Sequence, residues 1–151
     1  MSFVDFQKHC TECEKGKPCG KYHIYVLTLQ NEVASRDWFL EANPDYVDGM
    51  ECLYVGMTSH LPKCRASQHQ FCHVGNWEGK EYICYCSGKG ELKACSIGTR
   101  GSGKIGKYNK YLLRKKLFRR HNPQNDQQSS KQAEESLAEA LRKMGYGVWT
   151  N

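Results

Sequence analysis

Hydrophobic residues recur along the chain in short runs that predict alternating strands and helices. Runs rich in β-branched and aromatic residues are typical of strands, and they occupy residues 22–29, 52–57, 81–86 and 146–150. Helical spacing, capping residues and breakers predict helices over residues 35–42, from 58 or 59 to about 74, over 109–120 and from 129 to 145. Strands interspersed with helices in a short chain predict a small mixed α/β domain.

Local signals set the expected starts of two helices. Pro62 is expected in the first turn of its helix, with Thr58 or Ser59 as the cap. Ser129 and Gln132 are spaced as a capping box for the last helix. Both helices would therefore follow directly on short polar connections.

Chain length bounds the domain organisation. The 151 residues fit one domain, expected over residues 21–151, preceded by an irregular segment at 1–20 that is dense in Cys, Gly and Lys. No apolar run reaches the ~18 residues of a membrane helix, so no membrane association is expected. The first residues lack the basic and apolar regions of a secretory signal. These features predict a cytoplasmic protein, or a nuclear one in a eukaryote.

Positive charge is concentrated in one part of the chain. Lys and Arg number 22 against 16 Asp and Glu, a net charge of +6. Nine of the basic residues and no acid fall within residues 98–121. In the helix expected at 109–120, Leu112, Leu113 and Leu117 would face inward and the basic residues outward. The basic block predicts a polyanionic partner, most simply nucleic acid, with a solvated helix face as the alternative.

Nine cysteines are many for this length, and their number is odd. Without an export signal a disulfide framework is not expected, and reduced thiols in a reducing compartment are predicted. Such thiols are either small buried hydrophobes or metal ligands. Cys52, Cys64 and Cys95 are expected to be buried hydrophobes, and Cys84 and Cys86 to pack in a core.

The N-terminal segment has the spacing of half a zinc site. The nearby candidate ligands are His9, Cys10, Cys13 and Cys19. The two sulfurs of a Cys-x-x-Cys pair can bind one tetrahedral Zn²⁺ ion. Cys19 with His9, or a distal ligand such as Cys72 or His73, would complete the site. A thiol-bearing tail without zinc is the alternative.

Two predicted strands each carry a tyrosine that could take part in catalysis. Because side chains alternate along a strand, Lys21, His23 and Tyr25 share one face. Tyr54 lies opposite Val55 in its own strand, so tyrosines from two paired strands can meet over one surface. A tyrosine with its usual pKa of about 10 is a poor base at neutral pH and needs a nearby cation or proton acceptor. Ordinary strand aromatics are the alternative interpretation.

In two predicted helices, the spacing shows which face the charged residues occupy. Arg65 and His69 are four residues apart and therefore share a helix face. In the last helix, Glu134 falls at the border of the buried stripe, whereas Glu135 and Glu139 point to solvent. A metal ligand must stand at such a border, and among these three only Glu134 does. Alternatively, Arg65 and His69 are ordinary surface residues. The alternative for Glu134 is an acid near the start of its helix that interacts favourably with the helix dipole.

The order of these motifs resembles the GIY-YIG nuclease superfamily over residues 22–151. The matching fragments are His23-Ile24-Tyr25, Tyr54-Val55-Gly56, Arg65 with His69, Ala133-Glu134 with Leu137, and Gly145-Tyr146. The resemblance implies an α+β fold with a small, mostly antiparallel sheet flanked by helices. It also implies a DNA endonuclease that hydrolyses phosphodiester bonds with one divalent ion, Mg²⁺ or Mn²⁺, bound to Glu134.

The resemblance implies a role for each matched residue. One of Tyr25 and Tyr54 activates the attacking water, Arg65 holds the scissile phosphate, and His69 assists proton transfer. The side chains expected to contact DNA are Lys21, His23, Arg100, Lys104, Lys107, Arg114, Lys115 and Asn151. The sequence departs from the pattern at Met57, where some members have lysine. A second departure is the 28 residues between the tyrosines, so residues 31–50 must pack as an added element.

Other functions remain open at this point. The main alternative is a non-catalytic nucleic-acid-binding module on the same scaffold. A metal-storage or redox protein built on the cysteines is the second, and it leaves the tyrosine motifs unexplained. A homodimer would suit double-strand cleavage, but the sequence does not require one.

Overall fold

A four-stranded sheet forms the centre of the chain in this computed structural model, which describes residues 21–85 and 89–150. Its strands are β1 (His23–Leu29), β2 (Cys52–Thr58), β5 (Asn109–Leu113) and β6 (Gly147–Thr150), in the order β5-β1-β2-β6. β1 pairs antiparallel with both β2 and β5, and β6 pairs parallel with β2. The small mixed sheet, with its helices, confirms the predicted α+β class.

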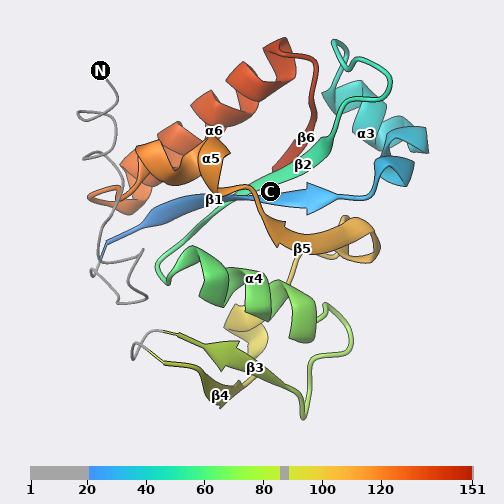
Figure 1. Cartoon of the computed structure of the whole chain (residues 1–151). Helices are drawn as coiled ribbons and strands as arrows, with labels where there is room; N and C mark the ends of the chain where they lie inside the picture. Colours follow the sequence, from blue (N-terminus) through green and yellow to red (C-terminus); the bar gives the residue numbers. More distant parts are fainter. Residues whose placement is uncertain (1–20, 86–88, 151) are drawn as a thin grey trace.

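Helices cover both sides of this sheet. The α-helices are α3 (Asp37–Ala42), α4 (Pro62–Phe71), α5 (Lys115–Phe118) and α6 (Gln127–Lys143). Short 3-10 turns occur at η1 (Asn31–Ser35), η2 (Ile97–Thr99), η3 (Gly106–Tyr108) and η4 (Arg119–His121). Figure 1 shows α5 and α6 above the sheet and α4 below it, with the hairpin of β3 (Glu81–Cys84) and β4 (Glu91–Ala94) beneath α4. No helix in the described ranges is long and apolar enough to cross a membrane.

Strand β1 is buried along its whole length because it lies in the middle of these layers. All seven residues of His23–Leu29 are buried, including the polar His23 and Thr28, so both faces of the strand are covered. The β1–β2 register pairs Tyr25 with Gly56 and Leu27 with Tyr54. Since Tyr25 and Leu27 are two residues apart, the two tyrosines lie on the same face of the sheet.

Residues 31–50 pack as an added element, as predicted. Phe39 of α3 is fully buried in the main core. The amide of Asn43 anchors the segment: its Nδ2 donates to the carbonyls of Phe39 and Val148, and its Oδ1 accepts from the Val148 N–H at 2.7 Å. The insertion is thereby joined to β6 at the far edge of the sheet.

The helix predicted over residues 109–120 is wrong for its first half, and only α5 at Lys115–Phe118 is α-helical. Residues Asn109–Leu113 form β5, which pairs with the open edge of β1 through Leu27↔Leu113 and Leu29↔Asn109. Leu112 is therefore 60% exposed rather than inward-facing. A free strand edge offers unpaired backbone groups, and satisfying them outweighs the helical spacing of the leucines.

Two helix starts also differ from the prediction. α6 begins at Gln127, because the side chain of Asp126 accepts a hydrogen bond from the Ser129 N–H at 2.7 Å and acts as the cap. α4 begins at Pro62 with Leu61 as its cap. Thr58 remains in β2, where its hydroxyl accepts from the His60 N–H. Thr58, expected as a helix cap, is thus part of the preceding strand instead.

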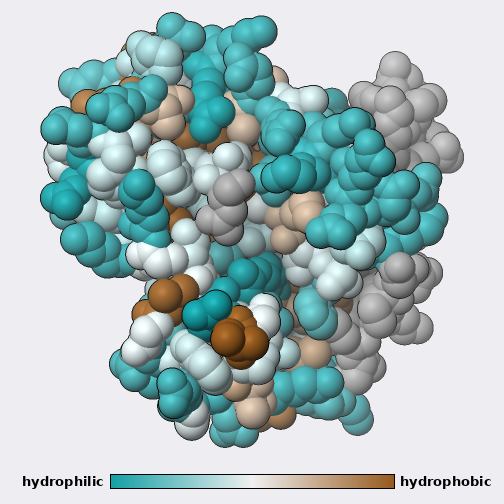
Figure 2. Space-filling model, turned by 180° about the vertical axis from the view of Figure 1, so that it is seen from behind, coloured by the Kyte–Doolittle hydropathy of each residue, from teal (hydrophilic) through white to brown (hydrophobic). Residues whose placement is uncertain are grey.

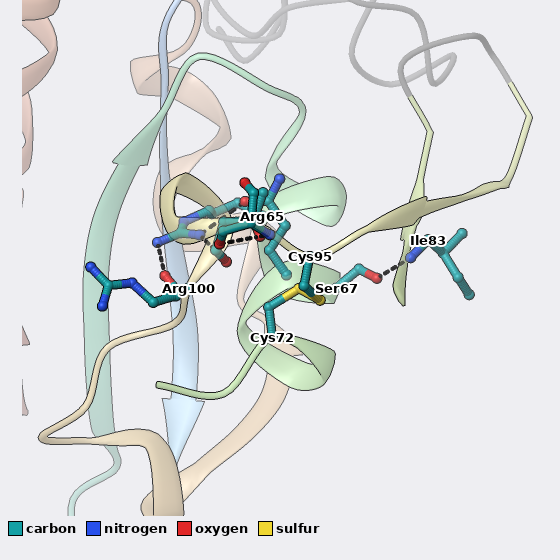
Figure 3. Close-up of a disulfide and its surroundings, with 9 residues drawn as sticks. Arg65, Ser67, Cys72, Ile83, Cys95 and Arg100 are labelled. Carbon is teal, nitrogen blue, oxygen red and sulfur yellow. Dashed lines mark hydrogen bonds between the residues drawn. A yellow bond between two sulfur atoms is a disulfide. The ribbon is translucent and has the colours of Figure 1, made fainter. Parts of the chain in front are cut away.

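A second, smaller core lies between α4 and the β3–β4 hairpin. Its buried members are Leu61, Cys64, Cys72, Tyr82, Cys84 and Cys95. Cys72 and Cys95 form a disulfide with a Cα–Cα distance of 5.6 Å (Figure 3). The expectation of a reduced Cys95 is therefore wrong. Cys95 follows β4, and the hairpin folds back on the end of α4, so the two sulfurs meet although 23 positions separate them.

The remaining cysteines divide into two groups. Cys52, Cys64 and Cys84 are buried and take no part in this disulfide, as predicted for small hydrophobes. Cys10, Cys13 and Cys19 of the predicted zinc site, the 1–20 segment that holds them, and Cys86 lie outside the described residues. Cys72 is oxidised, so it is not a thiolate ligand for zinc in this structure.

Candidate active site

A small pocket of about 140 Å³ opens where four elements meet. Its lining residues are Tyr25 from β1, Tyr54, Gly56 and Met57 from β2, Arg65 from α4, and Lys131 and Glu134 from α6. Four of the five residues predicted to be catalytic therefore meet in one pocket. The fifth, His69, lies behind Tyr25.

The two tyrosines pack against each other above Gly56. Their ring centroids are 6.1 Å apart, and both side chains are 1% exposed. A Cβ at position 56 would lie 2.6 Å from Cζ and from Oη of Tyr25, closer than any real contact. Gly56 is therefore required for the position of the Tyr25 ring, which explains why the residue two after Tyr54 has no side chain.

His69 contacts Tyr25 directly. Its Nε2 lies 2.8 Å from Tyr25 Oη, and its Nδ1 accepts a hydrogen bond from the Ser102 backbone N–H at 3.3 Å. Burial, and then the charge of Arg65, lowers the pKa of His69 to about 3, so the ring is neutral at pH 7. A neutral ring that accepts at Nδ1 carries its proton on Nε2. His69 therefore donates to Tyr25 Oη.

Both phenols are protonated at neutral pH in this structure. Burial raises the pKa of Tyr25 to about 12, although Arg65 and a hydrogen bond with Tyr54 lower it in part. Burial also raises the pKa of Tyr54 well above its usual 10, and Tyr25 raises it further. The tyrosine whose anion the surroundings favour is thus Tyr25.

Arg65 is fixed in place by three hydrogen bonds. Its Nη1 donates to Gln68 Oε1 at 2.9 Å and to the Thr99 carbonyl at 3.0 Å. Its Nη2 donates to the Arg100 carbonyl at 2.9 Å (Figure 3). The guanidinium reaches the pocket in a single orientation because the loop that follows the hairpin supplies two of these acceptors.

Glu134 is the acid of the pocket. Its side chain is 4% exposed, whereas Glu135 and Glu139 are exposed, as helical spacing predicted. Burial raises the pKa of Glu134 to about 7, with Lys131 opposing the shift. A carboxyl with this pKa is poised between its neutral and charged forms at physiological pH.

The pocket fits a small hard cation in its donor chemistry. One carboxylate with water and phosphate oxygens is a usual environment for Mg²⁺. No group of three or more His, Cys, Asp or Glu residues that could hold a metal occurs among residues 21–85 and 89–150. Water and phosphate oxygens would therefore have to supply most of the coordination shell of any such ion.

The residues predicted to contact DNA are placed very differently from one another. His23 is 1% exposed and its Nδ1 bonds to the His60 carbonyl at 3.0 Å, so its expected surface position is wrong. It is covered because β1 lies between two layers. Arg114 forms an ion pair with Glu51 at 2.7 Å. Asn151 lies outside the described residues.

The other basic residues remain on the surface. Lys21, Lys104, Lys107 and Lys115 are exposed. Lys104 Nζ lies 4.9 Å from the Trp38 ring centroid and 5.2 Å from that of Trp149. Arg100 is exposed as well, and its Nε donates to the Ile97 carbonyl. Figure 2 shows the back of the molecule as mainly hydrophilic, with a few hydrophobic side chains on its lower part.

Sequence reasoning missed two contributors to this site. Lys131 precedes Glu134 by three residues, so helical spacing places them on one face, and that signal was present in the sequence. Ser102 supplies the backbone N–H that sets the proton position on His69, and no sequence signal indicates such a contact.

Comparisons with known proteins found no matching family model, no matching curated protein and no matching solved structure. What this site does must therefore be inferred from its own side chains.

Proposed function

We propose that this chain is a metal-dependent endonuclease that hydrolyses DNA phosphodiester bonds at a single-metal site of the GIY-YIG type. The observation that carries the proposal is the pocket where the Glu134 carboxyl, the Arg65 guanidinium and the phenols of Tyr25 and Tyr54 meet. These four residues come from four elements, and no structural need explains a buried acid beside two buried phenols. A cation site, a phosphate-binding group and a proton acceptor are the parts that this hydrolysis requires.

Arg65 is the phosphate-binding group. The planar guanidinium suits phosphate oxygens because it offers parallel charged N–H groups. Three hydrogen bonds hold it before substrate arrives, so little side-chain freedom is lost on binding. Lys131 adds a second positive charge to the same pocket.

Glu134 is the residue that would hold the divalent ion, Mg²⁺ or Mn²⁺. When bound, such an ion supplies Lewis-acid stabilisation of charge on the phosphate and the leaving oxygen. Positive charge beside Glu134 favours its ionised form and so opposes the effect of burial on its pKa. One carboxylate supplies few of the ligands that Mg²⁺ needs, so weak binding of the ion in the absence of DNA is expected.

Tyr25 is the favoured acceptor for the proton of the attacking water. Its anion would receive a hydrogen bond from His69 Nε2 and feel the positive charge of Arg65. His69 acts in this arrangement as a hydrogen-bond donor to Tyr25 and does not remove its proton. A cation held by Glu134 would lower the pKa of the phenol toward the working range, so that Tyr25 would release its own proton to solvent before it accepts the proton of the attacking water.

DNA on either side of the cut would lie along exposed basic residues. Lys104, Lys107 and Lys115 remain on the surface for this role. Each phosphate contact contributes nearly one unit to the slope of log affinity against log salt concentration. Binding should therefore weaken steeply between low and moderate salt.

The proposal is tested by cleavage of supercoiled, linear and branched DNA with Mg²⁺ or Mn²⁺, with and without chelator. Glu134→Gln should lower the rate by about 100-fold or more. Glu139→Gln, at an exposed position of the same helix, should stay within about twofold.

Equal cleavage by wild type and Glu134→Gln would sink the enzyme proposal. If both proteins are inert but bind DNA equally well, the chain is the non-catalytic nucleic-acid-binding module that the sequence left as an alternative. Affinity measured in the same preparations separates these outcomes.

A further inference from the structure

A second, larger pocket lies on the other side of His69. Its volume is about 510 Å³, and it lies between the end of α4, the glycine-rich loop at 101–106 and strand β5. His69 belongs to both surroundings, because its Nε2 contacts Tyr25 while its Nδ1 contacts Ser102. The pocket is thus one side chain away from the proposed cleavage site.

The lining of this pocket favours an anionic ligand. Of the described residues that line it, none is acidic, whereas Lys107, His73 and the amide of Asn109 can all donate hydrogen bonds. Gly101 lets the loop approach closely, since a Cβ there would lie 3.1 Å from His69 Nδ1. Gly106 faces open space, so the entrance is not filled by a side chain.

Asn109 lines this pocket and carries a buried amide donor. Its side chain is 6% exposed, and its Oδ1 accepts from the Tyr111 N–H at 2.7 Å. Within the part of the chain that the structure describes, its Nδ2 has no hydrogen-bond partner. A buried donor without an acceptor is destabilising, so a small rotation of the amide that lets it donate to a ligand oxygen in the pocket would be favourable.

The backbone of Tyr111 adopts the left-handed conformation, which is unfavourable for tyrosine. Its φ is +61°, and no other non-glycine residue in the described ranges has a positive φ. Glycine or asparagine adopts this left-handed region more readily than tyrosine. The ring lines the pocket and lies 6.3 Å from that of His73. An aromatic residue kept at a strained position points to a use for its ring.

We propose that this pocket binds one nucleotide of the DNA strand, next to the nucleotide whose phosphodiester is cut. Its phosphate would be bound by Lys107 and Asn109, and its base would lie against Tyr111. The proposal rests on the proposed nuclease function. A base inside a pocket cannot remain in a duplex stack, so the substrate class is DNA with an unpaired or locally opened nucleotide near the cut.

The test compares two ligands that differ only in the base. Deoxyadenosine 5′-monophosphate and 2-deoxyribose 5-phosphate are titrated into the full chain without divalent metal, and NMR follows the Asn109 amide and the Tyr111 ring. The nucleotide should bind about 5- to 100-fold more tightly, the range of base stacking on aromatic side chains. Lys107→Gln should weaken both ligands.

Tyr111→Asn provides the decisive variant because it relieves the backbone rather than damaging the fold. It should keep or raise the melting temperature, lower nucleotide affinity at least about fivefold, and leave sugar-phosphate affinity within about twofold. Equal affinity of wild type for the two ligands would overturn the proposal, and so would shifts confined to other regions or no binding at millimolar concentration.

Failure of the nuclease function would look different. In that case the chain would cleave no DNA form but the nucleotide would still bind at Tyr111, and the pocket would belong to a nucleic-acid-binding module. A nuclease whose Tyr111→Asn variant binds the nucleotide normally would contradict the pocket proposal alone.

Discussion

Tyr25 Oη lies 2.8 Å from His69 Nε2, and the backbone N–H of Ser102 on the other side of the ring fixes which partner donates. Because His69 Nδ1 accepts from Ser102, the Nε2–H of the neutral imidazole donates a hydrogen bond to Tyr25 Oη. The histidine therefore supports a tyrosinate without being the base that creates it. This relationship makes a substitution series informative.

We expect His69→Gln to retain more activity than His69→Leu. A glutamine amide can donate to Tyr25 Oη but cannot serve as a base, so it should stay within about tenfold of wild type, whereas leucine should lose about 100-fold or more. Single-turnover cleavage at saturating metal measures both. If glutamine and leucine are equally inactive, His69 acts as a base and the hydrogen-bond assignment is wrong.

Gly56→Ala should displace the Tyr25 ring. The new Cβ would lie 2.6 Å from Tyr25 Cζ, in a core where neighbouring side chains leave little room. We expect about 1–3 kcal/mol lower unfolding free energy and at least about tenfold lower activity. Chemical denaturation and cleavage assays measure the two effects.

Gly98→Ala is the matched control for that experiment. A Cβ at position 98 would meet no atom closer than Ser96 Oγ at 3.9 Å, so both properties should stay near wild type. Wild-type activity in Gly56→Ala would show that the ring position of Tyr25 is unimportant.

Glu134 should make the protein less stable as pH rises. Its folded-state pKa of about 7 lies above the ordinary 4.5, so between these values the folded chain keeps a proton that the unfolded chain has lost. Stability is therefore full below about pH 4.5 and falls as pH rises toward and past 7. Glu134→Gln removes the free-energy cost of ionising this buried carboxyl, so it should stabilise the protein by about 1–3 kcal/mol at pH 8.

The measurement is thermal or urea unfolding at several pH values without divalent metal. Glu139→Gln, on the exposed face, should follow wild type. Parallel pH curves for wild type and Glu134→Gln would contradict the raised pKa. Added Mg²⁺ should stabilise wild type more at pH 8 than at pH 5, because the ion needs the ionised carboxylate.

Reduction of the Cys72–Cys95 disulfide should affect the active pocket as well as stability. Cys95 leads into the loop whose Thr99 and Arg100 carbonyls hold Arg65. Loss of the bond should lower the unfolding free energy by about 2–4 kcal/mol. The added freedom of the loop should also raise the KM for DNA.

A Cys72→Ser, Cys95→Ser double variant and a thiol count of the native chain measure these effects. Cys84→Ser changes a buried thiol of the same lobe that forms no disulfide, and it serves as the control. An unchanged KM for DNA after reduction would show that other contacts hold the loop that carries Thr99 and Arg100.

The sequence by itself determined the elements that are stabilised locally. β1 and β2 are runs rich in apolar residues, and the stripe on α6 sets Glu134 apart from its exposed neighbours, so these features follow from side-chain period alone. The motif spacing also identified the four predicted residues that line the pocket. What lies close in sequence, or repeats with a fixed period, could be predicted.

Only the tertiary structure decided what depends on distant partners. The edge of β1 made residues 109–113 a strand, and the position of the hairpin against α4 joined Cys72 to Cys95. Burial beneath a layer made His23 internal, and the proton position on His69 follows from a contact with Ser102, 33 residues away. Such outcomes are set by which backbone and side-chain groups remain unsatisfied once the layers pack, and local sequence carries no record of that.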